Sequence, residues 1–344
     1  MRTVVGLCAL LSLGSCLHVA VAQEAEGRIA FYSNRDGNDE IYLINADGSG
    51  VTNLTSNPAR DLEPTWSPDG SKIAFRSKRG GAWDIYVMNA DGSGVRNLSN
   101  DPSVDKLPAW SPDGSQIAFR SNRDGNWEIY VVNADGSGLR NLTNNPAYDT
   151  APAWSPDSSQ IAFRSSRDHP DQIYLINTDG SGERQLTNNP GAVGELQTVS
   201  LSDLAWSPDG STIALLAGDL NSVYKNIASV SVDAGELKLL TSGLDRHGRP
   251  RWSPDGRQIV CDCKREDNSD IYVMNADGSE VRRLTDGPAN DWFPVWSPDG
   301  SKIAFQSERD DNWEVYVVNV DGSGLSNLTN DAGDDHGVAW AAAH

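Results

Sequence analysis

Aspartate residues recur at one place in a repeated pattern, five residues before a tryptophan. They are Asp61, Asp105, Asp149, Asp291 and Asp335, while Leu201 and His247 stand at the two remaining places. Carboxylates bind hard cations such as calcium, and a ring of them attracts basic protein segments. The pattern predicts a partner-binding ring that includes His247. A second interpretation stays open, in which each aspartate caps its own turn or pairs with a nearby arginine.

A second repeated feature supplies such arginines. An Arg-Asp pair recurs in a turn at Arg35-Asp36, Arg123-Asp124, Arg167-Asp168 and Arg309-Asp310, and Arg79 is followed by Gly80. Three tryptophans adjoin these turns, namely Trp83, Trp127 and Trp313. They could form an aromatic contact surface, or they could pack between neighbouring units.

Catalytic constellations are not evident in the sequence. It contains no Gly-x-Ser-x-Gly elbow, no Walker loop and no Cys/His group with zinc spacing. Abundant carboxylates leave a glycosidase pair open. We therefore expect a protein that is not an enzyme and needs no cofactor, with calcium as the one metal worth considering. Cys261 and Cys263 alternate along one strand, roughly 6.7 Å apart, which favours buried thiols over a disulfide.

The chain of 344 residues carries a formal net charge of −20. Such a charge disfavours nucleic acid and anionic lipid, and it favours cations or basic partners. Residues 1–22 read as a signal peptide that ends at Ala20-Val21-Ala22, although Leu13-Gly14-Ser15-Cys16 loosely resembles a lipidation site. No later segment approaches the ~20 apolar residues of a membrane span. We expect a periplasmic or secreted protein with one domain over residues 23–344.

These residues lie within an internal repeat. Trp-Ser-Pro-Asp-Gly begins at Trp66, Trp110, Trp206, Trp252 and Trp296, Trp154 begins a copy with Ser158 in place of glycine, and Trp340 stands alone. Successive tryptophans are 44, 44, 52, 46, 44 and 44 residues apart. Each repeat offers four short runs separated by turn signals, and runs such as residues 85–88 are apolar on both faces. A four-stranded unit of this length, repeated in tandem, is typical of a propeller blade.

The two ends of the repeat predict how the ring closes. The first run, at Ile29, corresponds to the second strand of a blade, and the last run, residues 337–340, corresponds to a first strand. The sequence therefore predicts an all-β, seven-bladed β-propeller of four-stranded antiparallel blades, in which the C-terminal strand completes the N-terminal blade. We name the strands of a blade A to D from the channel outward, so that the tryptophan strand is strand A.

One blade departs from the repeat length. The additional residues fall in the D–A connection around residues 191–203 and in the B–C turn near residues 218–225. In a propeller both connections lie on one face, and binding residues concentrate on such loops. Tyr224 and Lys225 are therefore candidate contacts, while neutral variation of a tolerant loop is the alternative.

The combination of Trp-Ser-Pro-Asp-Gly, Ile-Ala-Phe, Arg-Asp-Gly-Asn, Ile-Tyr and Asn-Ala-Asp-Gly-Ser-Gly resembles the TolB propeller family over roughly residues 28–340. The resemblance implies an exported propeller that docks a protein on one face, as TolB proteins of the Tol–Pal envelope system bind the peptidoglycan-associated lipoprotein. TolB proteins also carry an α/β domain before a six-bladed propeller, so this chain departs from them. We expect a monomeric protein-binding scaffold, with an envelope lipoprotein as a candidate partner. A glycan-binding or glycan-cleaving propeller that uses the same channel face is the alternative.

Overall fold

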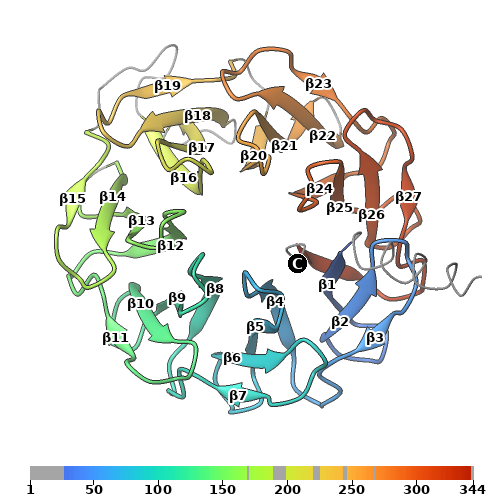
Figure 1. Cartoon of the computed structure of the whole chain (residues 1–344), viewed down its shortest axis with the longest axis horizontal. Helices are drawn as coiled ribbons and strands as arrows, with labels where there is room; N and C mark the ends of the chain where they lie inside the picture. The colour runs from blue at the N-terminus through green and yellow to red at the C-terminus, as the bar shows by residue number, and fades with distance from the viewer. Residues whose placement is uncertain are drawn as a thin grey trace, which may run out of the picture.

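The fold is a closed ring of seven β-sheets around a central channel (Figure 1). The computed structural model describes residues 27–168, 170–188, 199–219, 225–242, 246–265 and 268–341. Within these ranges every regular element is a strand, and each sheet contains four antiparallel strands. The predicted fold class, including the number of blades, is confirmed.

Blade 1 combines both ends of the described chain, and the other blades are continuous in sequence. Blade 1 consists of β28 (Asp335–Trp340), β1 (Arg28–Ser33), β2 (Glu40–Asn45) and β3 (Thr52–Asn53). Blade 2 consists of β4 (Asp61–Trp66), β5 (Lys72–Ser77), β6 (Asp84–Asn89) and β7 (Arg96–Asn97). Blade 3 consists of β8 (Asp105–Trp110), β9 (Gln116–Ser121), β10 (Glu128–Asn133) and β11 (Arg140–Asn141). Blade 4 consists of β12 (Asp149–Trp154), β13 (Gln160–Ser165), β14 (Gln172–Asn177) and β15 (Arg184–Gln185).

Of the remaining blades, blades 5 and 6 carry the longest strands. Blade 5 consists of β16 (Val199–Trp206), β17 (Thr212–Asp219), β18 (Asn226–Ser231) and β19 (Leu237–Leu239). Blade 6 consists of β20 (Arg246–Trp252), β21 (Gln258–Arg265), β22 (Asn268–Asn275) and β23 (Arg282–Arg283). Blade 7 consists of β24 (Asp291–Trp296), β25 (Lys302–Ser307), β26 (Glu314–Asn319) and β27 (Ser326–Asn327).

Strand β28 closes the ring as the innermost strand of blade 1. It pairs with β1, where Ile29 lies opposite Trp340 and Ser33 lies opposite Asp335. The indole nitrogen of Trp66 in blade 2 donates a hydrogen bond of 3.1 Å to the carbonyl of Ala339. The C-terminal strand therefore joins blade 1 to blade 2 as well as to its own sheet.

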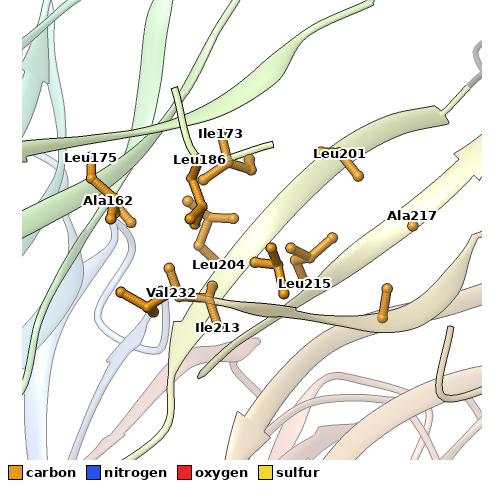
Figure 2. Close-up of a cluster of buried hydrophobic side chains, with 12 residues drawn as sticks. Ala162, Ile173, Leu175, Leu186, Leu201, Leu204, Ile213, Leu215, Ala217 and Val232 are labelled. Atoms are coloured by element: carbon orange, nitrogen blue, oxygen red, sulfur yellow. The ribbon is translucent and has the colours of Figure 1, made fainter. Parts of the chain in front are cut away.

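The core lies between neighbouring blades because strand B is covered on both faces. In β5, Ile73 and Phe75 pack toward blade 1, whereas Ala74 packs toward blade 3. A small alanine on one face thus leaves room for the large side chains of the next blade. Figure 2 shows the corresponding layer between blades 4 and 5, in which Ile173 and Leu186 meet Leu204 and Leu215. No single blade could bury this apolar surface alone.

Aspartate side chains stabilise the turns between strands A and B. In the turn after β4, Asp69 Oδ1 accepts hydrogen bonds from the Ser67 hydroxyl at 2.6 Å and from the Ser71 backbone N–H at 3.1 Å. Gly70 supplies the positive φ of 58° that the turn requires. These hydrogen bonds, first from Ser67 and then from Ser71, lower the pKa of Asp69 to about 2.

We predict that Asp69 titrates near pH 2 in the folded protein and near its ordinary value when unfolded. Its stabilising contribution is fully present above about pH 4 and is lost as the pH falls toward 2, because the folded state releases the proton more readily. A carboxyl-detected NMR titration measures the pKa directly. In the Ser67→Ala/Ser71→Ala variant the pKa should rise toward 3.8. An ordinary pKa for Asp69 in the unaltered protein would contradict the turn geometry.

Strand A carries a bulge three residues before its tryptophan in every blade. The ladder register shifts there, and six of the residues adopt positive φ without being glycine: Glu63, Leu107, Ala151, Asp203, Arg249 and Phe293. Bulges re-aim side chains, and positive φ in residues other than glycine is uncommon. The bulge directs Asp203, Arg249 and Phe293 into a cavity at the channel.

Smaller sequence predictions also have outcomes. Cys261 and Cys263 are buried thiols, as predicted. The short closing strand of blade 3, β11, comprises residues 140–141, and Leu142 follows it with a buried side chain. Residues 1–26, which include the predicted signal peptide, lie outside the described residues.

Candidate functional site

The five repeated aspartates are buried members of ion pairs. Each begins strand A, is at most 1% exposed and meets an arginine from the B–C turn of the same blade. The N–O distances are 2.7 to 2.9 Å for Asp61–Arg79, Asp105–Arg123, Asp149–Arg167, Asp291–Arg309 and Asp335–Arg35. The interpretation that paired each aspartate with a nearby arginine therefore describes the geometry.

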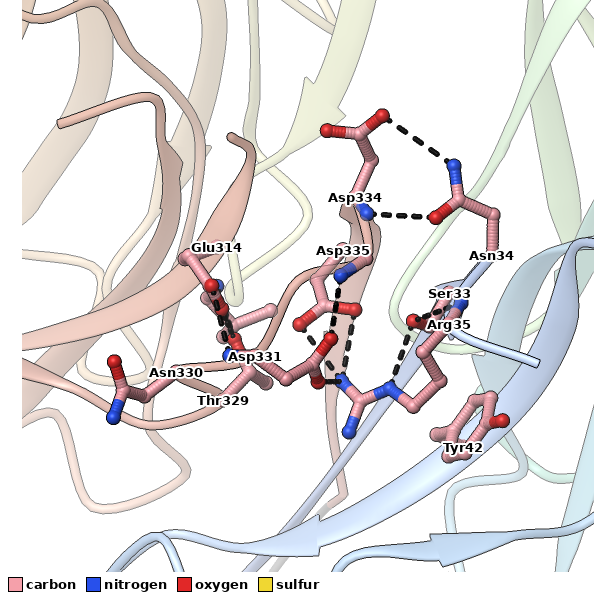
Figure 3. A network of polar contacts seen from close by, with 12 residues as sticks. Ser33, Asn34, Arg35, Tyr42, Glu314, Thr329, Asn330, Asp331, Asp334 and Asp335 are labelled. Atoms are coloured by element: carbon pink, nitrogen blue, oxygen red, sulfur yellow. Dashed lines mark hydrogen bonds and ion pairs between the residues drawn. The ribbon is translucent and has the colours of Figure 1, made fainter. Parts of the chain in front are cut away.

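Figure 3 shows this arrangement in blade 1. The Arg35 guanidinium donates to both carboxylate oxygens of Asp335, at 2.9 and 2.8 Å, and its Nε donates to Ser33 at 2.9 Å. The guanidinium lies 4.7 Å from the centre of the Tyr42 ring. Because β28 contributes Asp335 and the turn after β1 contributes Arg35, this pair spans the closure of the ring.

The five aspartates of the predicted partner-binding ring are therefore closed to solvent in this structure, and each is bound to a guanidinium. A carboxylate that is buried and already bound to a guanidinium does not face a partner. The local reason is that strand A begins beneath the B–C turn, so its first side chain points into the blade and its backbone N–H bonds to the preceding blade. For example, the Asp105 N–H donates to the carbonyl of Trp83 at 2.7 Å.

His247 and Lys225 occupy a different place, next to a cavity. His247 is 5% exposed, and its Nε2 lies 4.0 Å from the Cys263 sulfur. The Lys225 ammonium donates to the Asp219 carbonyl at 3.2 Å, and burial lowers its pKa. Both residues line the same cavity. Tyr224, the other candidate contact, lies outside the described residues.

This cavity is the candidate functional site, with a volume of about 770 Å³. It opens at the channel mouth, which we define as the end that carries the B–C turns and D–A connections. Its walls come from the inner strands of blades 5, 6 and 7 and from the turns beside them. They include Asp203, Lys225, Arg249, Asp262, Trp292 and Phe293.

Charge in the cavity is dense and largely buried. The Arg249 guanidinium lies 3.2 Å from the centre of the Phe293 ring, and burial lowers its pKa against the opposing effect of Asp262. Burial raises the pKa of Asp262, although Arg249 opposes this shift. Asp262 Oδ1 is buried and has no hydrogen-bond partner among the described residues. A buried acceptor in this state costs free energy, which a bound donor would recover.

Aromatic rings continue from the cavity toward blade 1. Trp292 stacks on Trp313 with ring centres 4.9 Å apart, and Trp313 lies 5.8 Å from His336. His336 lies 5.4 Å from Tyr32. We call Trp292, Trp313, His336 and Tyr32 the aromatic row. Trp313 was identified from the sequence as a candidate contact, and it is partly exposed in this row.

Sequence reasoning missed Asp203, Arg249, Asp262, Trp292 and Phe293. A signal was present, because Asp262 stands where the aligned strands of blades 2 to 4 have Arg76, Arg120 and Arg164. The bulge that turns Asp203 and Arg249 into the channel leaves no comparable mark in the sequence. As for metals, no group of three His, Cys, Asp or Glu residues in the described ranges is placed to hold an ion.

Comparison with known proteins decides the family. The model of the TolB beta propeller domain matches residues 96–249 and 245–342. The chain belongs to the TolB β-propeller family. A second model, the N-terminal propeller domain of Tricorn protease, matches residues 37–124 of this TolB-family chain. The resemblance inferred from the repeat is thereby confirmed.

Individual relatives differ in how much they share. The chain is 50% identical over 44 residues to the Tol-Pal system protein TolB of Geobacter sulfurreducens, a match that spans only 10% of that protein and 13% of this one. The crystal structure of TolB from Acinetobacter baumannii aligns with a TM-score of 0.60 and 22% identity, covering 93% of this chain and 67% of that one.

The fold of this TolB-family propeller is also found in enzymes. An oligogalacturonate lyase from Vibrio parahaemolyticus aligns with a TM-score of 0.71 and 17% identity, covering 87% of this chain and 88% of that one. At this identity the likeness concerns the fold alone. Within the described residues, no helix is long and apolar enough to cross a membrane.

Proposed function

We propose that this chain is a non-enzymatic scaffold of the cell envelope, periplasmic after removal of its first 22 residues, that binds a protein partner at the channel mouth. One observation carries the proposal. The cavity of about 770 Å³ lies where blades 5 and 6 lack the repeated Asp–Arg pair. These blades instead place the charged side chains of Asp203, Arg249 and Asp262 in the channel. Membership of the TolB β-propeller family supports the same role. The protein binds this partner as a monomer, and it needs neither a cofactor nor calcium to do so.

The arrangement suits a partner that inserts an anchoring segment. Trp292 and Phe293 offer apolar surface, while Asp262 and Arg249 offer a buried acceptor and donors within the cavity. Aromatic residues and arginine dominate the energetics of protein interfaces when they lie in such pockets. An envelope lipoprotein is the partner that the family suggests.

Affinity capture from native envelope extract tests the proposal, with the tagged protein and its Arg249→Gln/Phe293→Ala variant as baits. We expect one protein to be recovered by the parent and at least tenfold less by the variant, with or without EDTA. The substitutions are tolerable because Leu107 and Ala151 occupy the same bulge position as Arg249 and Phe293.

Arg257→Gln is the matched control, since this arginine lies on an A–B turn at the opposite face and its side chain is 84% exposed. It should recover as much partner as the parent. Equal recovery by the parent and the cavity variant would exclude the cavity as the docking site. Loss of the partner in EDTA alone would exclude binding without a metal.

The aromatic row favours a second candidate function, a glycan-binding or glycan-cleaving propeller. Indole rings can stack on sugars, and Trp292 is partly exposed at the border of the cavity. A panel of oligosaccharides tested for binding and turnover distinguishes this candidate. It is supported if an oligosaccharide binds the parent but not Trp292→Ala while no protein is captured.

A further inference from the structure

The channel mouth at blades 2 and 3 is basic, although the chain carries a net charge of −20. Arg76 and Arg120 occupy equivalent positions in β5 and β9, and Lys106 is the second residue of β8. Each guanidinium lies 4.6 Å from the centre of a tryptophan ring, Arg76 over Trp83 and Arg120 over Trp127. We call Arg76, Lys106 and Arg120 with their two tryptophans the basic arc.

The positive charges of the basic arc are poorly compensated. Arg76 makes an ion pair of 3.3 Å with Glu63, but no ion pair within 4.0 Å involves Arg120 or Lys106 in the described part of the chain. The Nε atoms of Arg76 and Arg120 are buried and lack hydrogen-bond partners there. Desolvated donors without acceptors cost free energy unless a ligand supplies the acceptor.

Mutual repulsion adds to this cost. Burial and then the nearby charges of Arg76 and Arg120 lower the pKa of Lys106, and burial lowers the pKa of Arg120. Glu63 is the acid that opposes both shifts. An anion bound between the three cations would relieve the repulsion and the desolvation together.

The fold does not require these cations. The position of Arg76 and Arg120 in strand B is filled by Tyr32 in blade 1, Leu216 in blade 5 and Gln306 in blade 7. Each lies opposite the strand-A residue that comes four before the tryptophan. Neutral side chains therefore fit the same backbone. The cations of the basic arc are better explained by binding than by structure.

The geometry favours carboxylates as the ligand. Each tryptophan is contacted by two cations, Trp83 also by Lys78 at 5.5 Å and Trp127 also by Lys106 at 5.8 Å. The rings thus support the cations instead of offering open faces to sugars. A guanidinium over a ring still has N–H groups to donate, and its planar fork matches a carboxylate.

We infer that the basic arc binds side-chain carboxylates of an acidic segment in the protein partner. This inference rests on the proposed function and specifies the chemistry of the partner. The cavity and the basic arc lie on the same channel mouth, so one partner could occupy both. The overall negative charge restricts such a segment to this local basic surface, because repulsion disfavours it elsewhere.

Titration calorimetry with an N-acetylated, C-amidated hexaglutamate peptide tests the inference at low ionic strength. We expect the Arg76→Gln/Lys106→Gln/Arg120→Gln variant to bind at least tenfold more weakly than the parent. The Lys238→Gln/Arg282→Gln/Arg257→Gln variant removes the same charge from exposed sites away from the channel mouth and should bind like the parent. Urea unfolding midpoints establish that both variants are folded.

Three results would overturn the inference. The parent could fail to bind the peptide, both variants could bind the peptide equally more weakly than the parent, or the parent could bind oligogalacturonate tightly and the peptide not at all. Failure of the proposed function looks different. If capture from extract recovers a partner that the cavity variant loses but the basic-arc variant retains, the scaffold stands and the inference fails. If the peptide binds the basic arc while no protein is captured, the carboxylate site stands and the scaffold role fails.

Discussion

Replacing Arg309 with methionine should lower the free energy of unfolding by about 3 to 5 kcal/mol at neutral pH, the cost of breaking a buried ion pair from one side. Asp291 is 1% exposed, and Arg309 Nη2 donates to both of its carboxylate oxygens, at 2.9 and 2.8 Å. Arg309 also donates to Ser307 at 2.7 Å and lies 4.7 Å from the Tyr316 ring. Methionine retains packing against the ring but leaves the carboxylate unpaired.

Urea unfolding measured by tryptophan fluorescence gives the difference. The double variant Asp291→Leu/Arg309→Met should recover much of the loss, because blade 5 shows that Leu201 fits at the aspartate position. Arg257→Met, on a side chain that is 84% exposed, should change stability by less than about 0.5 kcal/mol. A loss below about 1 kcal/mol for Arg309→Met would mean that these pairs do not stabilise the blades.

The sequence predicted the ring because its determinants are local and repeated. Each blade repeats its turn residues and its alternation of large and small side chains, as in Ile73, Ala74 and Phe75. The closure also followed, since a second strand at Ile29 and a first strand at Trp340 leave one way to complete a blade. Such features depend on neighbours in sequence or on exact repetition, and both are visible in a single chain.

The side chains at the channel mouth could not be predicted in the same way. The aspartates and arginines were both recognised, but whether they pair depends on the direction of the first side chain in strand A. The cavity depends on the bulge, which turns Asp203 and Arg249 toward Asp262 across two blades. The repeat could have directed attention to these positions, because blades 5 and 6 alone place Leu201 and His247 where the others have aspartate.

Removing β28 should have the largest effect on stability. A chain that ends at residue 334 loses the ladder with β1, the Arg35–Asp335 ion pair and the acceptor of the Trp66 indole. Arg35 keeps its second ion pair, with Asp331, so the lost ladder and the uncovered core carry most of the effect. The loss also removes Val338 from a core cluster and uncovers Ile29 and Phe31 of the same cluster. We expect a total loss above about 5 kcal/mol, comparable to the entire stability of many domains.

Thermal unfolding followed by circular dichroism, with binding of a hydrophobic dye, measures this effect. The truncated chain should lose its cooperative transition and bind the dye, whereas a chain ending at Ala341 retains every described strand and should unfold like the parent. A synthetic peptide of residues 335–341 should restore the transition by filling the vacant place beside β1, since the missing element is a single strand with its own pairing register. Cooperative unfolding of the truncated chain at the parent's temperature would show that blades 1 and 2 hold the ring without the closing strand, and the stability of the propeller would then reside in the interblade core alone.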